Sequence, residues 1–253
     1  MTFTFVFFSI VSISENIADV RSRIEVAARR AGRNSSAITL MAVSKTFPVE
    51  SVRLAYAAGI RVFGENRVQE FAGKADALRV LSGVEWHLIG HLQSNKAAKA
   101  VELFDAVDSI DSMKLAEKLN AAAEKMGKTL PVLIEINVGG EEAKSGIGLG
   151  SGELSRILIN ADTWKNLAVR GLMTVPPYIE DPEGARPYFR RLREIRDKIA
   201  ARNLPGISMD VLSMGMSHDF EVAIEEGSTC VRVGTAIFGE RKALQKSEVR
   251  LQK

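Results

Sequence analysis

The sequence predicts an α/β protein, a (β/α)8 barrel with one additional helix in front. Short apolar runs alternate with helical patterns, and eight such units in 253 residues match the size of one barrel. Strands that alternate with helices form a parallel sheet, whose buried strands read as continuous apolar runs. A doubly wound open sheet is the alternative. Against it, the first expected strand is followed by SKTFPVE and not by a G-x-G-x-x-G loop.

The first helical pattern precedes the barrel. The stretch SENIADVRSRIEVAARR is amphipathic. Ser14 or Asn16 is the expected N-cap, because short polar side chains accept hydrogen bonds from the free N–H groups of the first helical turn. We expect this helix to run to Arg30 and to stop near Gly32.

The remaining elements follow in order. The helices show apolar residues three or four positions apart, as at Phe71, Ala75 and Leu78. The expected strands cover residues 38–44, 60–65, 84–90, 103–110, 130–138, 166–174, 207–214 and 229–238. The expected helices cover residues 48–58, 66–81, 94–101, 112–126, 153–160, 185–202 and 218–226.

The composition is that of an ordinary globular domain, with 46% hydrophobic and 26% charged residues. A net charge of only +3, from 34 basic and 31 acidic residues, argues against a dedicated nucleic-acid surface. Cys230 is the one cysteine and lies in an apolar stretch. It has no partner for a disulfide or a cysteine metal site, so we expect a buried structural residue and a reducing, cytoplasmic location.

The two ends of the chain differ from the expected barrel domain, which we place at residues 14–241. Residues 1–13 are apolar but too short to span a bilayer, and no basic region precedes them. Three interpretations remain: an extension packed on the barrel, a poor secretion signal, or a misplaced start with Val11 as the true initiator, which we favour. Residues 242–253 form a charged tail, and we expect no membrane association.

Lys45 ends the first apolar run. It is therefore expected at the carboxyl end of a barrel strand, where the active sites of such barrels lie. In a partly dry pocket its amine would be neutral more often and would attack an aldehyde to form a Schiff base. A solvated lysine at a strand end is the alternative.

The expected loops after the seventh and eighth strands carry groups suited to a phosphate. Ser217 precedes a helix, and Gly234 and Thr235 offer backbone N–H groups. A plain N-cap role for Ser217 is the alternative. Arg232 points either outward between helices or inward, where it needs an acceptor such as the aromatic nitrogen of a ligand.

The histidines do not predict a metal site. His87 lies in the third expected strand and His91 beyond a glycine, so the two do not share a helical face. Few other residues of the usual ligand types stand near them, and we expect no bound metal. His87 is expected to be a hydrogen-bonded residue near the barrel mouth.

Seven motifs carry a resemblance to a known family. On these motifs the chain resembles the pyridoxal phosphate homeostasis proteins, single-domain relatives of the alanine racemase barrel, over about residues 14–241. Arg67 stands where tyrosine is most often expected, and His218 occupies a position that varies. The motifs are A-V-S-K-T (42–46), F-G-E-N-x-V-Q-E (63–70), W-H-L-I-G-H-L-Q-S-N-K (86–96), N-V-x-x-E-x-x-K-S-G (137–146), G-L-M-T (171–174), L-S-M-G-M-S-x-D (212–219) and V-R-V-G-T-A-I-F-G (231–239).

The resemblance implies a site for pyridoxal 5'-phosphate. Lys45 would hold the cofactor as a Schiff base, and Arg232 would face the pyridine nitrogen. The residues that would bind the phosphate are Ser217, Gly234 and Thr235. The residues that would line the pocket are Asn66, His87, Asn137, Met173 and Ser213. Lys144 is implied as a second lysine near the mouth.

Two main functions remain open. The resemblance implies a non-catalytic, monomeric protein that binds pyridoxal 5'-phosphate reversibly and supplies it to apoenzymes. The alternative is a pyridoxal-phosphate-dependent amino-acid racemase or related enzyme. Against it, racemisation needs two bases and the sequence offers only Lys45, while an arginine at the pyridine nitrogen makes the ring a weaker electron sink. A third and weaker alternative is a nucleotide- or sugar-phosphate barrel in which Lys45 is only a charge partner.

Overall fold

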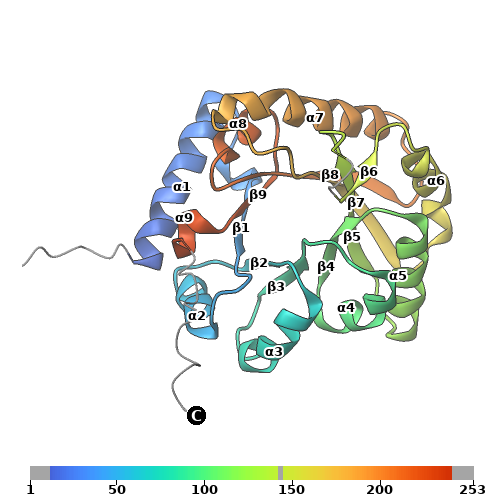
Figure 1. The fold of residues 1–253 in the computed structure, drawn as a ribbon, viewed down its shortest axis with the longest axis horizontal. Helices are drawn as coiled ribbons and strands as arrows, with labels where there is room; N and C mark the ends of the chain where they lie inside the picture. Colours follow the sequence, from blue (N-terminus) through green and yellow to red (C-terminus); the bar gives the residue numbers. More distant parts are fainter. Residues whose placement is uncertain (1–11, 142–144, 241–253) are drawn as a thin grey trace, which may run out of the picture.

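The computed structural model describes residues 12–141 and 145–240, in which eight parallel strands close into a barrel ringed by helices (Figure 1). Each strand pairs with the next, β4 pairs with β5, and the last strand returns to the first. The ring closes, so the predicted (β/α)8 barrel is confirmed and the open sheet is excluded. The strands of the ring are β1 (Thr39–Val43), β2 (Val62–Glu65), β3 (Glu85–Leu88), β4 (Ala106–Ile110), β5 (Leu130–Asn137), β7 (Leu167–Met173), β8 (Ile207–Met216) and β9 (Cys230–Val233).

The helices alternate with these strands as the sequence predicts. One short strand was not expected: β6 (Ile147–Gly148) pairs with the end of β5, outside the ring. The α-helices are α1 (Ile13–Arg30), α2 (Val49–Ala57), α3 (Val68–Leu78), α4 (Ala97–Leu103), α5 (Met113–Lys125), α6 (Glu153–Asn160), α7 (Arg186–Ala200), α8 (Phe220–Glu225) and α9 (Thr235–Phe238).

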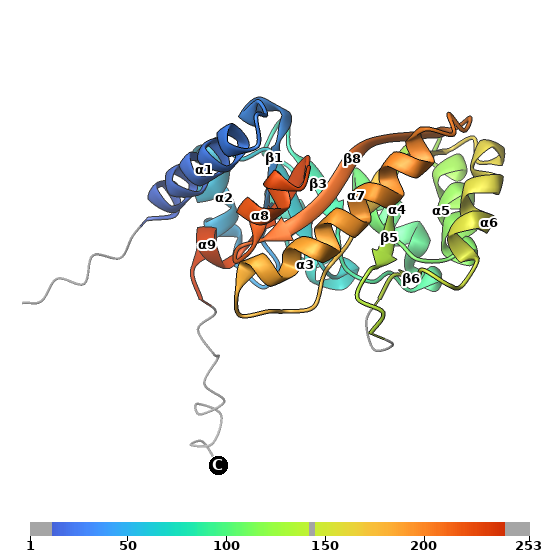
Figure 2. The ribbon, with the colours of Figure 1, turned by 90° about the horizontal axis from the view of Figure 1, so that it is seen from above.

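Helix α1 is the additional helix, and it lies outside the barrel against α8 and α9 (Figure 1, Figure 2). The expected cap at Ser14 or Asn16 is wrong. Ser12 is the N-cap: its hydroxyl accepts the N–H of Glu15, and the Glu15 carboxylate accepts the N–H of Ser12. This reciprocal capping box places the N-cap two residues before the expected domain boundary at residue 14, and the helix itself begins at Ile13. Asn16 instead donates its side-chain amide to the carbonyl of Ile237 in α9.

The eighth strand of the ring is shorter than expected. The sequence predicted extended structure over residues 229–238, but β9 ends at Val233 and the chain turns directly into α9. The run VGTAIF is mostly apolar, so its hydrophobicity does not distinguish a buried strand from a short buried helix. The early turn matters for function, because it places the N–H groups of residues 234–236 beside the end of the strand.

The core between the barrel and α3 follows the predicted spacing. Phe71, Ala75 and Leu78 are buried, as their positions along the helix predict. Phe71 packs against Trp86, with ring centroids 4.7 Å apart, and against Phe104 at 4.9 Å. Burial of such large apolar side chains stabilises the fold by about 1.5–3 kcal/mol each. This packing holds α3 against β3 and against the segment that joins α4 to β4.

Some expectations concern residues outside the described ranges. The proposed start at Val11, most of the apolar extension and the charged tail at 242–253 fall there. Within residues 12–141 and 145–240, no helix is both long enough and apolar enough to cross a membrane.

Candidate functional site

A cavity of about 360 Å³ lies at the carboxyl ends of the barrel strands. Its volume is in the range of small-ligand pockets. The walls are mostly apolar, with a few polar groups that come from different strand ends. The lining residues are Val43, Lys45, Phe47, Asn66, Ile89, Val175, Met216, Ser217, His218, Arg232, Gly234 and Thr235.

Lys45 reaches this cavity from the turn that follows β1, as predicted. The turn runs from Ser44 to Phe47 and is closed by a hydrogen bond from the Phe47 N–H to the Ser44 carbonyl, at 3.2 Å. Lys45 is partly buried. A lysine amine in such a setting is a candidate nucleophile toward an aldehyde.

Arg232 points into the barrel, which resolves the two orientations left open by the sequence. Its side chain is only 3% exposed and donates to the Ser213 hydroxyl and to the Thr174 carbonyl, each at 2.7 Å. Burial lowers the pKa of the guanidinium, while the nearby carboxylates of Asp108 and Glu135 raise it. The group remains a cation, because guanidinium keeps its proton in proteins.

Ser217 does not act as a helix cap. The N-cap of α8 is Asp219, and the Ser217 hydroxyl instead accepts the N–H groups of Gly234, at 3.1 Å, and Ala236, at 3.3 Å. These two N–H groups converge on one point at the edge of the cavity. Backbone donors that converge in this way can receive an anion. The structure brings Ser217 to the predicted loop, but the hydrogen bonds are to Gly234 and Ala236, while Thr235 lines the cavity beside them.

Asn66 supplies an unsatisfied acceptor. It follows β2 and lines the cavity, and its Oδ1 atom is buried without a hydrogen-bond partner in the described part of the chain. Buried side-chain oxygens nearly always have a partner, so an orphaned one beside a cavity indicates that a ligand or water completes it. Together with Lys45, Arg232 and the N–H pair, this atom fits a ligand that has an aldehyde, an anionic end and polar ring substituents.

Glu135 is a buried acid near this end of the barrel. It lies on β5, is 5% exposed, and its Oε2 atom has no hydrogen-bond partner among the described residues. Burial raises the pKa of its carboxyl to about 7, although the positive charge of Arg232 acts in the opposite direction. No role for Glu135 is evident from the sequence, because a single acid inside an apolar strand carries no motif.

Three other predicted residues, all within the described part of the chain, do not line the cavity. Ser213 lies beneath it and supports Arg232. Met173 is fully buried at the end of β7, where it pairs in register with Ser213. The side chain of Asn137 closes its own loop, accepting the Gly140 N–H and donating to the Glu141 carbonyl. Lys144 lies outside the described residues.

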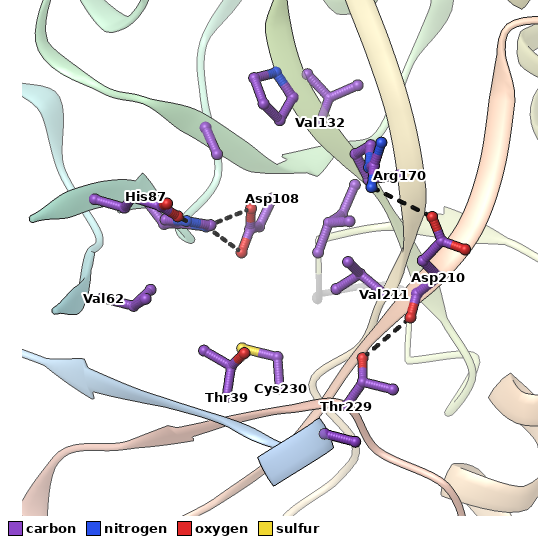
Figure 3. A pocket seen from close by; sticks show the side chains of 15 residues that line it. Thr39, Val62, His87, Asp108, Val132, Arg170, Asp210, Val211, Thr229 and Cys230 are labelled. Carbon is purple, nitrogen blue, oxygen red and sulfur yellow. Dashed lines mark hydrogen bonds and ion pairs between the residues drawn. The ribbon is translucent and has the colours of Figure 1, made fainter. Parts of the chain in front are cut away.

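His87 lies in a different place from the one expected. It lines a second cavity of about 370 Å³, formed by residues near the amino ends of the strands (Figure 3). Its Nδ1 atom lies 3.1 Å from the buried carboxylate of Asp108. Burial alone would lower the pKa of the imidazole, but Asp108 and Glu85 raise it to about 10. The expected position near the barrel mouth is therefore wrong. Asp108 on β4 holds the His87 ring toward the amino ends of the strands. The alternation of side chains along a strand predicts that a side chain faces inward, but it does not predict toward which end of the barrel the side chain points.

Cys230 lines the same second cavity and is buried, as predicted. Burial raises the pKa of its thiol to about 12, which disfavours the nucleophilic thiolate. No group of three or more histidine, cysteine or acidic side chains that would hold a metal occurs in the described ranges.

Half of the residues that line the cavity were not predicted from the sequence. Phe47 stacks on Phe238 of α9, with centroids 4.8 Å apart, and Ile89, Val175 and Met216 complete the apolar surface. His218 also lines the cavity, and its Nε2 donates toward the carbonyls of Ile179 and Glu180. Val175 and Met216 follow predicted strand ends, which is the one sequence signal that points to them, whereas Ile89 lies inside a predicted strand and His218 begins a predicted helix.

The barrel and the cavity together define a class of protein. It is a (β/α)8 barrel in which a lysine, a buried arginine and paired backbone N–H groups lie at one cavity. The family model of the alanine racemase N-terminal domain matches residues 16–242. The pyridoxal phosphate homeostasis protein of Aquifex aeolicus (strain VF5) is 47% identical over 228 residues, which are 90% of this chain and 98% of that protein. The structure of PipY from Synechococcus elongatus PCC7942 with pyridoxal 5'-phosphate bound is 36% identical, with a TM-score of 0.79 over 90% of this chain and 100% of that one.

The chain therefore belongs to the pyridoxal phosphate homeostasis proteins, within the family of the alanine racemase N-terminal domain. The resemblance inferred from the seven motifs is confirmed. An alanine racemase from Clostridium difficile 630 shares the fold, with a TM-score of 0.67 at 14% identity over 92% of this chain. The match covers only 58% of that enzyme.

Proposed function

We propose that the protein binds pyridoxal 5'-phosphate reversibly, through a covalent link to Lys45, and takes part in the homeostasis of this cofactor. One observation carries the proposal. Lys45, Arg232, Ser217 and Gly234 line a single cavity that is also lined by Asn66, whose Oδ1 atom has no partner among the described residues. The N–H groups of Gly234 and Ala236 converge on the Ser217 hydroxyl at its edge. The relatives named for pyridoxal phosphate homeostasis support it.

Each group has a part in holding the cofactor. Lys45 supplies the amine for the link. The N–H groups of Gly234 and Ala236, with the Ser217 hydroxyl, bind the phosphate. Arg232 faces the pyridine nitrogen and is held in place by Ser213 and Thr174. When bound, pyridoxal 5'-phosphate offers an aldehyde carbon and an aromatic ring that withdraws electrons.

We further propose that the bound cofactor is stored and not used for catalysis. Arg232 does not give up a proton to the ring nitrogen, so the ring remains a weak electron sink. Racemisation also needs a second base on the opposite face. Of the described lining residues, His218 is the remaining candidate base, and its Nε2 is engaged with two backbone carbonyls. A racemase or related enzyme is the second candidate function, because Lys45, which such an enzyme would use as a base, lines the cavity.

The setting of this function is also a proposal. We expect a cytoplasmic monomer that delivers the cofactor to apoenzymes. Sedimentation of the loaded protein tests the monomer. Recovery of activity by an apoenzyme that is mixed with it, measured against an equal amount of free cofactor, tests the delivery.

Absorbance of the purified protein with pyridoxal 5'-phosphate tests the binding. A visible band that is present in the native protein and in Lys99→Ala, an exposed lysine on α4, but lost in Lys45→Ala supports it. No band in any of them overturns it. Amino acids added in deuterated water then separate storage from catalysis: exchange of the α-proton faster than with free cofactor means an enzyme.

A further inference from the structure

A buried ion pair lies behind the turn that carries Lys45. Lys74 of α3 is 12% exposed and Glu65 at the end of β2 is fully buried, and the Lys74 amine lies 2.7 Å from the Glu65 Oε1 atom. The same amine donates to the Ser44 carbonyl, at 3.0 Å, and reaches the Phe47 carbonyl at 3.5 Å. The Ser44 hydroxyl donates to the same Glu65 oxygen, at 2.5 Å. One cation thus contacts both ends of a four-residue turn.

The turn needs such a contact because its conformation is unfavourable for its sequence. Thr46 has φ of 65°, in the left-handed region that β-branched residues avoid. Its side chain is exposed, so packing around Thr46 does not account for the conformation. Residues held in this region persist when the surrounding structure over-determines them. The contacts from Lys74 to Ser44 and Phe47 provide that constraint.

The far end of the turn also touches the anion-binding side of the cavity. Phe47 lines the cavity and stacks on Phe238 of α9, the helix that begins at the N–H groups of residues 234–236. A turn fixed at Phe47 therefore sets the distance between the Lys45 amine and those N–H groups. If the turn from Ser44 to Phe47 were mobile, the Lys45 amine and the N–H groups would both be present, but the distance between them would vary.

We propose that Lys74, held by Glu65, is a positioning residue for Lys45. It fixes the turn from Ser44 to Phe47 so that the amine of Lys45 enters the cavity at a set distance from the anion-binding N–H groups. This inference rests on the proposed function, since the effect concerns the residue that would link the cofactor. It adds a role for the buried pair that neither the sequence motifs nor the cavity lining assigns.

The direct test replaces the pair by neutral groups, Glu65→Gln with Lys74→Met, so that no uncompensated charge remains buried. The readouts are amide hydrogen exchange of residues 45–47 in the protein without cofactor, and the rate of borohydride trapping at Lys45 by pyridoxal, which has no phosphate. We expect faster exchange and about tenfold slower trapping, in line with the usual cost of a left-handed turn at a non-glycine residue. Adding Thr46→Gly should restore most of the rate, because glycine adopts this φ freely.

The matched control is Lys128→Met. Lys128 also donates its amine to a backbone carbonyl, that of Phe104 at 3.0 Å, but it lies away from the cavity. Its loss should leave trapping at Lys45 unchanged. If the double variant does not fold, Lys74→Arg keeps the charge, and its planar group does not reproduce the contacts of an ammonium. We then expect a trapping rate reduced severalfold.

The outcomes separate this inference from the proposed function. Native protein that shows no trapping at Lys45 overturns the proposed function. Native protein that traps pyridoxal while the double variant, or Lys74→Arg in its place, traps it equally fast overturns only the role of Lys74. A loss of rate in Lys128→Met as large as in the double variant also overturns it, because the effect is then one of general stability.

Discussion

At the scale of single residues, the site combines groups that the sequence identified with groups that it did not. Lys45 and Ser217 were predicted from their positions after strand ends, and Arg232 from the family resemblance; all three line one cavity. Glu135 was not, because its significance comes from burial beside Arg232, which only the folded chain creates. His87 was placed at the wrong end because its partner, Asp108, is distant in the sequence.

The Ser217 hydroxyl should matter for the phosphate and not for the aldehyde. We expect Ser217→Ala to weaken the binding of pyridoxal 5'-phosphate about tenfold, the usual effect of losing one hydrogen bond to a charged group. Binding of pyridoxal should change little. Fluorescence titration with both compounds measures the difference. An equal loss for both would mean that Ser217 shapes the cavity and does not bind the phosphate.

Glu135 should make the stability of the protein depend on pH. Its pKa is raised from 4.5 to about 7 because burial disfavours the charged form, so the folded state binds more protons than the unfolded state between these values. The free energy of unfolding should therefore fall as the pH rises from 4.5 to 7.

Glu135→Gln removes this term. We expect the variant to be more stable than the native protein above pH 7, by up to roughly 3 kcal/mol, and to differ little near pH 4.5. Urea unfolding across this pH range measures it, with the exposed Glu124→Gln on α5 as the control. If the free energies of unfolding of the native protein and the variant differ by the same amount at every pH, the raised pKa of Glu135 is contradicted.

At the scale of elements, the order of strands and helices was predictable and several boundaries were not. Apolar periodicity located every strand of the ring, because buried parallel strands are apolar throughout. It did not locate the turn at Gly234, since strand and short helix share the same apolar composition there. Nor did it locate the cap of α1, because Ser12, Ser14 and Asn16 are all chemically suitable.

The capping box at the start of α1 gives a test at this scale. Ser12→Ala should lower the free energy of unfolding by about 1 kcal/mol, because the N–H of Glu15 loses its acceptor. Ser14→Ala, at the position that the sequence favoured, should change it by less. Urea unfolding of the two variants compares them. A larger loss for Ser14→Ala would place the cap where the sequence alone suggested.

At the scale of the whole molecule, the barrel separates two cavities at opposite ends of its strands. The one at the carboxyl ends gathers Lys45, Arg232 and the N–H groups. The one at the amino ends gathers His87, Asp108 and Cys230 (Figure 3). The fold class was predictable from one sequence because the βα unit repeats. Contacts between neighbouring strands decide toward which of the two cavities an inward side chain points. These contacts cannot be read from the sequence.

The link at Lys45 is the central claim, and borohydride reduction of the protein loaded with pyridoxal 5'-phosphate tests it most directly. Reduction makes the link permanent, and mass spectrometry of the peptides then locates it. We predict one modified peptide, containing residues 42–46, with the added mass on Lys45, and none in Lys45→Ala. Modification spread over several surface lysines, or retained in Lys45→Ala, would contradict the account.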